Sequence, residues 1–186
     1  RSLPLGSSAL SLLDLTTGYA TFAAGGKRAR SYTVTQIRRP NGDLIYDRAR
    51  NAPALVQAFP EEKIAELNLM MNAVVTSGTG QRAKAVGRPV AGKTGTTNDM
   101  KDAWFVGFTS STVVGVWVGE DQPATIGREG YGARYALPIW SEFIKAAARK
   151  RGAREFTAPA GMRDEMLCSV SYMKPVEDCP TYTEYF

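Results

Sequence analysis

The stretch Val90-Ala91-Gly92-Lys93-Thr94-Gly95-Thr96-Thr97-Asn98-Asp99 decides how the rest of the chain is interpreted. It opens a region in which segments rich in Val, Phe, Trp and Thr alternate with short polar connections, namely 90–96, 103–109 and 112–119. Residues of these types favour β-strands. Because only Ser110 and Ser111 separate the last two segments, those two strands should pair antiparallel. We therefore expect an antiparallel sheet over residues 90–119.

Amphipathic helices are expected before and after these strands in the sequence. Apolar residues recur at helical spacing within three segments: Leu12, Leu15, Tyr19 and Phe22 in 8–24; Ile64, Leu67, Met70, Met71 and Val74 after Pro60; and Ile139, Trp140, Phe143, Ile144 and Ala147 in 137–151. Ser11 and Asp14 form a plausible capping pair for the first helix. Asn41-Gly42, between β-prone runs at 32–37 and 44–46, predicts a hairpin.

Helices, then antiparallel strands, then a further helix are typical of an α+β fold with helices packed on an antiparallel sheet. With 186 residues, the chain is long enough for one globular domain. No hydrophobic period follows Gly152. We therefore divide the chain into a folded portion, residues 1–152, and an irregular tail, residues 153–186.

The composition excludes several chemistries. The chain contains no histidine, which rules out a Ser-His-Asp or Cys-His arrangement within it and removes the commonest zinc ligand. Acid–base chemistry must therefore use Lys, Asp, Glu or Tyr, and we expect no metal or cofactor. The net charge of +5 is mild and looks scattered along the sequence, so it does not predict nucleic-acid binding.

Two features bear on the compartment of the protein. Cys168 and Cys179, if paired, would close a short loop and add about 3 kcal/mol of stability, which would imply an oxidising compartment. Two free cysteines remain an open alternative. There is no apolar run of the roughly 20 residues that span a bilayer, and no signal peptide is visible. Because the chain opens at Arg1, we expect a piece whose targeting segment lies upstream.

Residues 87–94 match the pattern of a phosphate-binding loop, Gly-x-x-x-x-Gly-Lys-Thr. Such a loop must follow a buried strand and open a helix, because the phosphates bind at the helix N-terminus. The preceding residues 81–85 are largely polar, and Gly-Thr-Thr-Asn after Lys93-Thr94 is a poor helix start. This segment has two other interpretations, and one of them is a plain structural strand and turn.

The other interpretation of residues 93–95 is the Lys-Thr-Gly motif of serine acyl-transferases that recognise penicillin. The Lys93 ammonium would face a substrate carboxylate, and the hydroxyls of Thr94 and Thr96 would hydrogen-bond it. Gly95 leaves the strand edge bare, so that substrate backbone can pair along it. A backbone N–H just beyond the glycine can stabilise a developing oxyanion.

The sequence around this motif resembles class A, bifunctional, penicillin-binding proteins. The match is densest over residues 91–121 and covers roughly residues 3–150. It includes Leu5-Gly6-Ser7-Ser8, Tyr19 to Ala23, Val74-Val75 with Gly78-Thr79-Gly80, and Ala136 to Trp140. The resemblance implies the C-terminal portion of a transpeptidase domain with the serine β-lactamase/D,D-peptidase-like fold.

The resemblance also implies a function. In this family a serine attacks the D-Ala-D-Ala bond of a peptidoglycan stem peptide and passes the acyl group to an amine, and β-lactams acylate the same serine. Lys93, Thr94, Gly95 and Thr96 match the substrate-binding motif. Lys93 and Thr96 would contribute directly to catalysis, the latter as an oxyanion donor. Asp102, Trp104 and Phe105 also match, and we interpret them as structural.

Two of the three family motifs are missing. The nucleophile motif Ser-x-x-Lys and the Ser-x-Asn motif would both precede Arg1, so we expect the isolated chain to be inactive. The nucleophile would come from an upstream part of a membrane-anchored protein on the periplasmic face of the bacterial inner membrane. Residues 171–174, Ser-Tyr-Met-Lys, and 96–98, Thr-Thr-Asn, are interpreted as chance matches, and Gly130-Tyr131-Gly132 departs from the family pattern.

Other functions remain possible on the same residues. A D,D-carboxypeptidase or a serine β-lactamase shares the motif without the long surrounding match. A non-catalytic β-lactam sensor would use the same fold as a binding domain. A phosphate-loop NTPase would be recognised by nucleotide binding.

Overall fold

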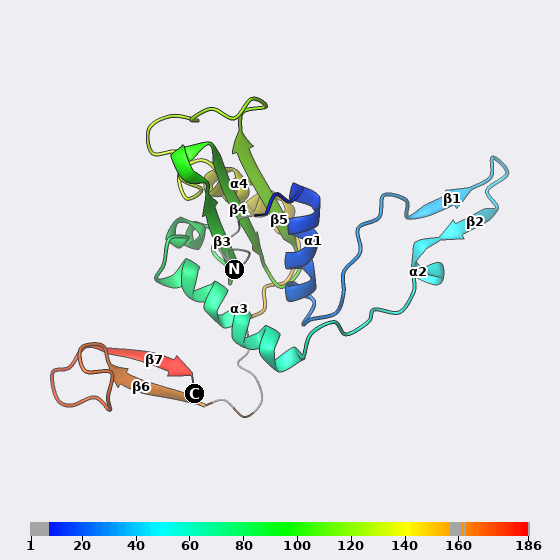
Figure 1. Ribbon diagram of the computed structural model, residues 1–186. Coiled ribbons are helices and arrows are strands. Elements are labelled where there is room, and N and C mark those ends of the chain that lie inside the picture. Colours follow the sequence, from blue (N-terminus) through cyan, green and yellow to red (C-terminus); the bar gives the residue numbers. More distant parts are fainter. Residues whose placement is uncertain (1–7, 157–160, 162, 186) are drawn as a thin grey trace.

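The computed structural model describes residues 8–156, 161 and 163–185. Its body is a three-stranded antiparallel sheet in the order β3-β4-β5, flanked by helices (Figure 1). The strands are β3 (Ala91–Thr96), β4 (Asp102–Phe108) and β5 (Val113–Gly119), and the helices are α1 (Leu12–Ala23), α3 (Glu61–Thr76) and α4 (Ala136–Ala147). The predicted α+β architecture and antiparallel pairing are confirmed.

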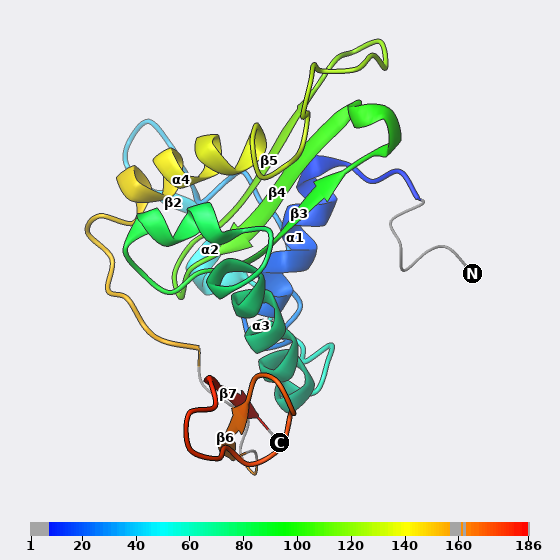
Figure 2. The ribbon, with the colours of Figure 1, turned by 90° about the vertical axis from the view of Figure 1, so that its left-hand side faces the viewer.

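The helices lie on opposite faces of the sheet, with α1 on one side and α4 on the other (Figure 2). On the first face, α1 lies close to β5 at Gly115, and Met71 of α3 packs with Ala91 and Phe108. On the second face, Trp140 of α4 is fully buried and meets the ring of Phe105 edge-on, 5.0 Å between centroids. The sheet is therefore covered on both faces over much of its length.

Trp140 connects α4 to strands β4 and β5. Its indole N–H lies 3.0 Å from the carbonyl oxygen of Val114 and 3.3 Å from that of Gly107. A buried indole needs such a partner, since an unpaired N–H away from water costs about 1–3 kcal/mol. Truncating a buried tryptophan costs about 3–5 kcal/mol, so this side chain is a main support of the sheet.

The three predicted helices are present, but α1 begins four residues after residue 8, α4 ends four residues before residue 151, and two buried faces differ. Ser11 caps α1, accepting the Asp14 N–H at 3.0 Å, as the sequence predicts. In α4 the buried residues are Ala136, Leu137, Trp140, Ser141 and Ile144. Ile139 and Phe143 are more than half exposed and Ala147 is exposed too, so the predicted inward orientation of these three residues is wrong. In α3, Met70 is 61% exposed and Val75 is buried in its place. In α4, small side chains allow the helix to approach the sheet closely. The buried face of the helix therefore depends on these small residues, and the pattern of large apolar residues alone does not identify it.

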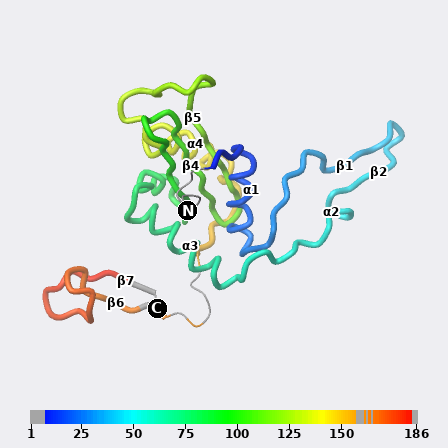
Figure 3. Tube along the Cα trace, in the orientation of Figure 1, coloured from blue at the N-terminus to red at the C-terminus, as the bar shows by residue number. Residues whose placement is uncertain are grey.

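Residues 27–57 form an arm that projects from the body (Figures 1 and 3). It contains β1 (Gln36–Arg38), β2 (Leu44–Asp47) and the short helix α2 (Arg48–Asn51). The predicted hairpin is confirmed, with Gly42 at φ 91° in its turn, although β1 is shorter than the expected run 32–37. At the base of the arm, Arg28 N–H donates to the Val56 carbonyl at 2.8 Å.

The tail is not irregular, contrary to the sequence prediction. It forms a hairpin of β6 (Asp164–Cys168) and β7 (Thr181–Tyr185), and a disulfide joins Cys168 to Cys179 with Cα atoms 5.6 Å apart. The disulfide stabilises this hairpin in a segment whose sequence has no hydrophobic periodicity that would predict a strand. In the part of the chain that the structure describes, no helix has both the length and the apolar character needed to cross a membrane.

The disulfide should stabilise the tail hairpin alone. Closing a loop of this size restricts the unfolded tail by about 3 kcal/mol. Reduction, or the double change Cys168→Ser and Cys179→Ser, should therefore raise amide hydrogen exchange in residues 164–185 by about 100-fold. The sheet peptide 102–119 serves as the internal control in the same mass-spectrometric measurement. Equal acceleration in both peptides would contradict this prediction.

Candidate functional site

The outer strand of the sheet, β3, carries the predicted motif along an edge that pairs with no other strand in the described residues. Thr97 N–H donates to the Asp102 carbonyl of β4 at 3.1 Å. Because antiparallel pairing alternates every second residue, the N–H and C=O groups of Thr94 and Thr96 point away from β4. The Lys93 ammonium donates to the Thr94 carbonyl at 2.9 Å, which agrees with this orientation.

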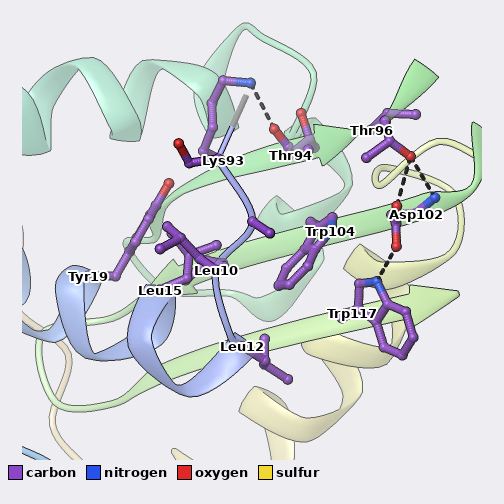
Figure 4. A pocket seen from close by; sticks show the side chains of 15 residues that line it. Leu10, Leu12, Leu15, Tyr19, Lys93, Thr94, Thr96, Asp102, Trp104 and Trp117 are labelled. Carbon is purple, nitrogen blue, oxygen red and sulfur yellow. Dashed lines mark hydrogen bonds between the residues drawn. The ribbon is translucent and has the colours of Figure 1, made fainter. Parts of the chain in front are cut away.

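A groove of about 740 Å³ lies beside this edge, between residues 8–19 and the sheet (Figure 4). Trp104, Val106 and Trp117 line its apolar part together with leucines of the α1 segment. The motif residues Lys93, Thr94, Gly95 and Thr96 form its polar part together with Ser8, Thr97 and Asp102. The groove thus combines apolar area with a few polar groups, as small-molecule and peptide sites do.

The motif side chains divide between the two faces of β3. Successive residues of a strand point to opposite faces, so Lys93 lies on the α1 face, whereas Thr94 and Thr96 lie on the α4 face. The Lys93 side chain is exposed beside the groove, with Tyr19 and Leu15 nearby (Figure 4). A β-carbon on Gly95 would lie 3.0 Å from the Cβ of Trp104, so glycine keeps this part of the groove open.

Both threonine hydroxyls have partners outside the strand. The Thr94 and Thr79 hydroxyls lie 2.8 Å apart, and Gly132 N–H donates to the Thr96 hydroxyl at 3.2 Å. A β-carbon on Gly132 would overlap the Trp104 carbonyl oxygen and lie 2.6 Å from that of Gly95. Only glycine therefore fits over the β3–β4 backbone at this position.

Thr79 and Gly132 are site residues that the sequence analysis did not assign. Thr79 follows α3 and Gly132 precedes α4, so neither lies near the motif in the chain. The sequence signals were Gly78-Thr79-Gly80, which belongs to the family match, and Gly130-Tyr131-Gly132, which departs from it. Neither indicated a contact with the motif hydroxyls. Their roles depend on tertiary contacts that no local pattern encodes.

Asp102 clamps the end of the sheet beside the motif. Its carboxylate accepts the Thr97 hydroxyl at 3.0 Å and the Trp117 indole N–H at 2.7 Å (Figure 4). The rings of Trp104 and Trp117 lie 6.3 Å apart, and both line the groove. Asp102 holds neighbouring strands together, Phe105 is buried in the core, and Trp104 contributes to the groove itself.

The structure excludes a phosphate-binding loop at this segment. Lys93 and Thr94 lie in the middle of strand β3, so no helix N-terminus follows them to hold phosphate. Among the described residues, no group of three or more His, Cys, Asp or Glu side chains is placed to hold a metal ion. The groove presents an ammonium, hydroxyls, the carboxylate of Asp102 and a strand edge as its chemical groups.

Two hydroxyl side chains that could suggest a nucleophile lack a general base. Ser8 lines the groove, but within the described part of the chain it has no hydrogen-bond partner, and residue 11 is another serine rather than a lysine. Ser171 lies in the loop of the tail hairpin and does not line the groove. Burial raises the pKa of Tyr19, so this groove phenol stays neutral at neutral pH.

The fold and the motif have close counterparts among known proteins. A family model described as "Penicillin binding protein transpeptidase domain" matches residues 2–145. Penicillin-binding protein 1A of Aquifex aeolicus is 39% identical over 158 residues, which cover 85% of this chain and 21% of that protein. The chain therefore spans about a fifth of the length of this curated relative.

Solved structures agree with this match. Penicillin-binding protein 1A from Haemophilus influenzae has a TM-score of 0.85 at 22% identity, covering 100% of this chain and 33% of that one. PonA1 from Mycobacterium tuberculosis, solved in complex with penicillin V, has a TM-score of 0.71 at 26% identity, covering 85% of this chain and 43% of that one. Of the predicted resemblance, Leu5, Gly6 and Ser7 lie outside the described residues. The chain belongs to the family of penicillin-binding protein transpeptidase domains.

Proposed function

We propose that this chain supplies the substrate-carboxylate side of the active-site cleft of a peptidoglycan D,D-transpeptidase. The observation that carries the proposal is the open edge of β3, where the Thr96 N–H points outward beside a groove lined by Lys93, Thr94 and Gly95. A stem peptide ending in D-Ala-D-Ala would pair along this edge as an added strand. The family membership supports the reaction class.

The groups of the site fit the stages of acyl transfer. The Lys93 ammonium and the threonine hydroxyls would hold the terminal carboxylate of the substrate. The Thr96 hydroxyl accepts the Gly132 N–H, so its own proton is free to be donated to that carboxylate. The outward N–H of Thr96 would serve as one oxyanion donor, which typically contributes a factor of about 100–1,000 in rate.

The serine nucleophile would come from a part of the protein upstream of this chain. It would attack the D-Ala-D-Ala carbonyl, release D-Ala, and pass the acyl group to an amine of a neighbouring stem peptide. β-Lactams would acylate the same serine. Residues 1–152 would form the transpeptidase portion and 153–186 an added tail, in a cell-wall synthase on the periplasmic face of the inner membrane.

A carboxypeptidase or β-lactamase would use the same edge with water as the acceptor, and a sensor domain would bind β-lactams without turnover. The long family match over residues 2–145 favours the transpeptidase. Product analysis separates these functions, because only a transpeptidase yields cross-linked dimers of stem peptides.

Fluorescent penicillin should label the longer protein that contains this chain and should not label the 186-residue chain alone. The physical reason is that the cleft has carboxylate-binding groups but no serine paired with a general base among the described residues. Gel fluorescence after incubation measures the label, and replacing the upstream serine should abolish it. Covalent label on the isolated chain at Ser171 would refute this account of the site.

Lys93→Met in the longer protein should slow acylation by benzylpenicillin about 10- to 100-fold, since a charge-assisted hydrogen bond to the carboxylate is lost. Lys84→Met is the matched control, because Lys84 is exposed and does not line the groove. Stopped-flow acylation rates compare the two. Equal acylation rates for Lys93→Met and wild type would show that Lys93 does not bind the carboxylate.

Gly132→Ala should also slow acylation, by about 10- to 100-fold, because the added methyl group would push the loop off the β3–β4 backbone and withdraw its N–H from Thr96. The loss should shrink when the penicillin carboxylate is esterified, because the ester no longer uses the oriented hydroxyl. Gly152→Ala, with open space around its β-carbon, is the control. The same loss with acid and ester would indicate general distortion rather than positioning.

A further inference from the structure

The net positive charge of the protein is carried by one segment and is not scattered, contrary to the sequence interpretation. The arm, residues 27–57, holds seven of the 23 cations and two of the 18 anions. Its net charge of +5 equals that of the whole chain, which leaves 16 cations and 16 anions elsewhere. The arm projects from the body (Figure 3), and six of its seven cationic residues are exposed, whereas Arg48 is half-buried.

The arm neutralises little of its own charge. Arg39 lies 4.0 Å from Asp43, an exposed pair of small energetic weight. The Asp47 carboxylate is held by the Ala49 N–H and the Gln36 amide, and these hydrogen bonds, together with the nearby Arg50, lower its pKa. Within the described residues, Lys27, Arg28 and Arg30 form no ion pair.

Three arginine residues of the arm line one hollow. Arg28, Arg30 and Arg48 line a space of about 80 Å³, closed on its other side by residues 53–56. Arg48 lies over the Tyr32 ring at 4.6 Å, which holds its guanidinium in place beside the hollow. The planar guanidinium fork matches the geometry of a carboxylate or phosphate group, and no protein anion lines this space.

We propose that the arm is a second binding site, separate from the groove, for a carboxylate-bearing polymer, with one carboxylate held in the three-arginine hollow. This proposal rests on the proposed function for the identity of the polymer: peptidoglycan, whose stem peptides end in carboxylates. The arm would hold neighbouring stem peptides of the strand that is being cross-linked.

The distribution of the cations favours an extended polymer over a single ion or a lipid surface. They occur at the base of the arm, beside α2 and next to the turn, so a chain of anions can contact several at once. The turn residues 40–43, Pro-Asn-Gly-Asp, carry no large apolar side chain that would enter a bilayer. Binding of the arm to anionic lipid vesicles is therefore the alternative that the experiment must exclude.

The test is co-sedimentation of the 186-residue chain with purified insoluble peptidoglycan. The arm variant R28Q/R30Q/R48Q should bind about eightfold more weakly, a factor of about two for each exposed contact. The control K84Q/R149Q/K150Q has the same net charge as the arm variant and changes three exposed cations of the body, so its affinity should match that of wild type. Circular dichroism melting checks that both variants fold. If the arm variant unfolds, R30Q alone, with an exposed side chain, should still lose about twofold.

Chemical amidation of the peptidoglycan carboxylates should abolish binding, and raising the salt concentration should weaken it. Equal losses in the arm and control variants would show that only net charge matters and would overturn the proposal. So would binding to vesicles containing phosphatidylglycerol without binding to peptidoglycan, or no binding to either. The assay contains no β-lactam and needs no acylation, so its failure is distinguishable from failure of the penicillin-labelling experiment.

Discussion

The hydrogen-bond ladder between β3 and β4 determines which groups of the site reach the open edge. Gly95 lies opposite Trp104 and Lys93 opposite Val106, so alternate residues turn their backbone groups outward. A slip of one residue would move every side chain to the other face and would turn the Thr96 N–H inward. The register is held from one face by Phe105 against Trp140 and from the end of the strands by the carboxylate of Asp102.

The motif strand is supported by segments that come before and after the sheet in the chain. Thr79 follows α3 and reaches the Thr94 hydroxyl, and Gly132 precedes α4 and reaches the Thr96 hydroxyl. Each contact orients a hydroxyl on an exposed strand, where a side chain would otherwise rotate freely. Binding groups held in place before a ligand arrives lose less entropy on binding, which is the physical advantage of this arrangement.

The sequence predicted the features that depend on neighbouring residues. The Ser110-Ser111 connection predicted antiparallel strands, Asn41-Gly42 predicted the arm hairpin, and both are confirmed. The inward face of α4 was missed, because Ser141 and other small side chains decide how closely the helix approaches the sheet. The contact of Gly132 with Thr96 could not be predicted either, since it joins residues 36 positions apart.

Because the excess charge lies on the arm while the rest of the chain carries equal numbers of cations and anions, the arm contributes a permanent dipole along its own direction. A body of this kind experiences a torque in the field of a negatively charged object. It rotates during diffusion before any contact forms, and in dilute salt this alignment extends over roughly a Debye length, about 8 Å at physiological ionic strength and about 30 Å at 0.01 M. First encounters with polyanions are thereby biased toward one end of the molecule.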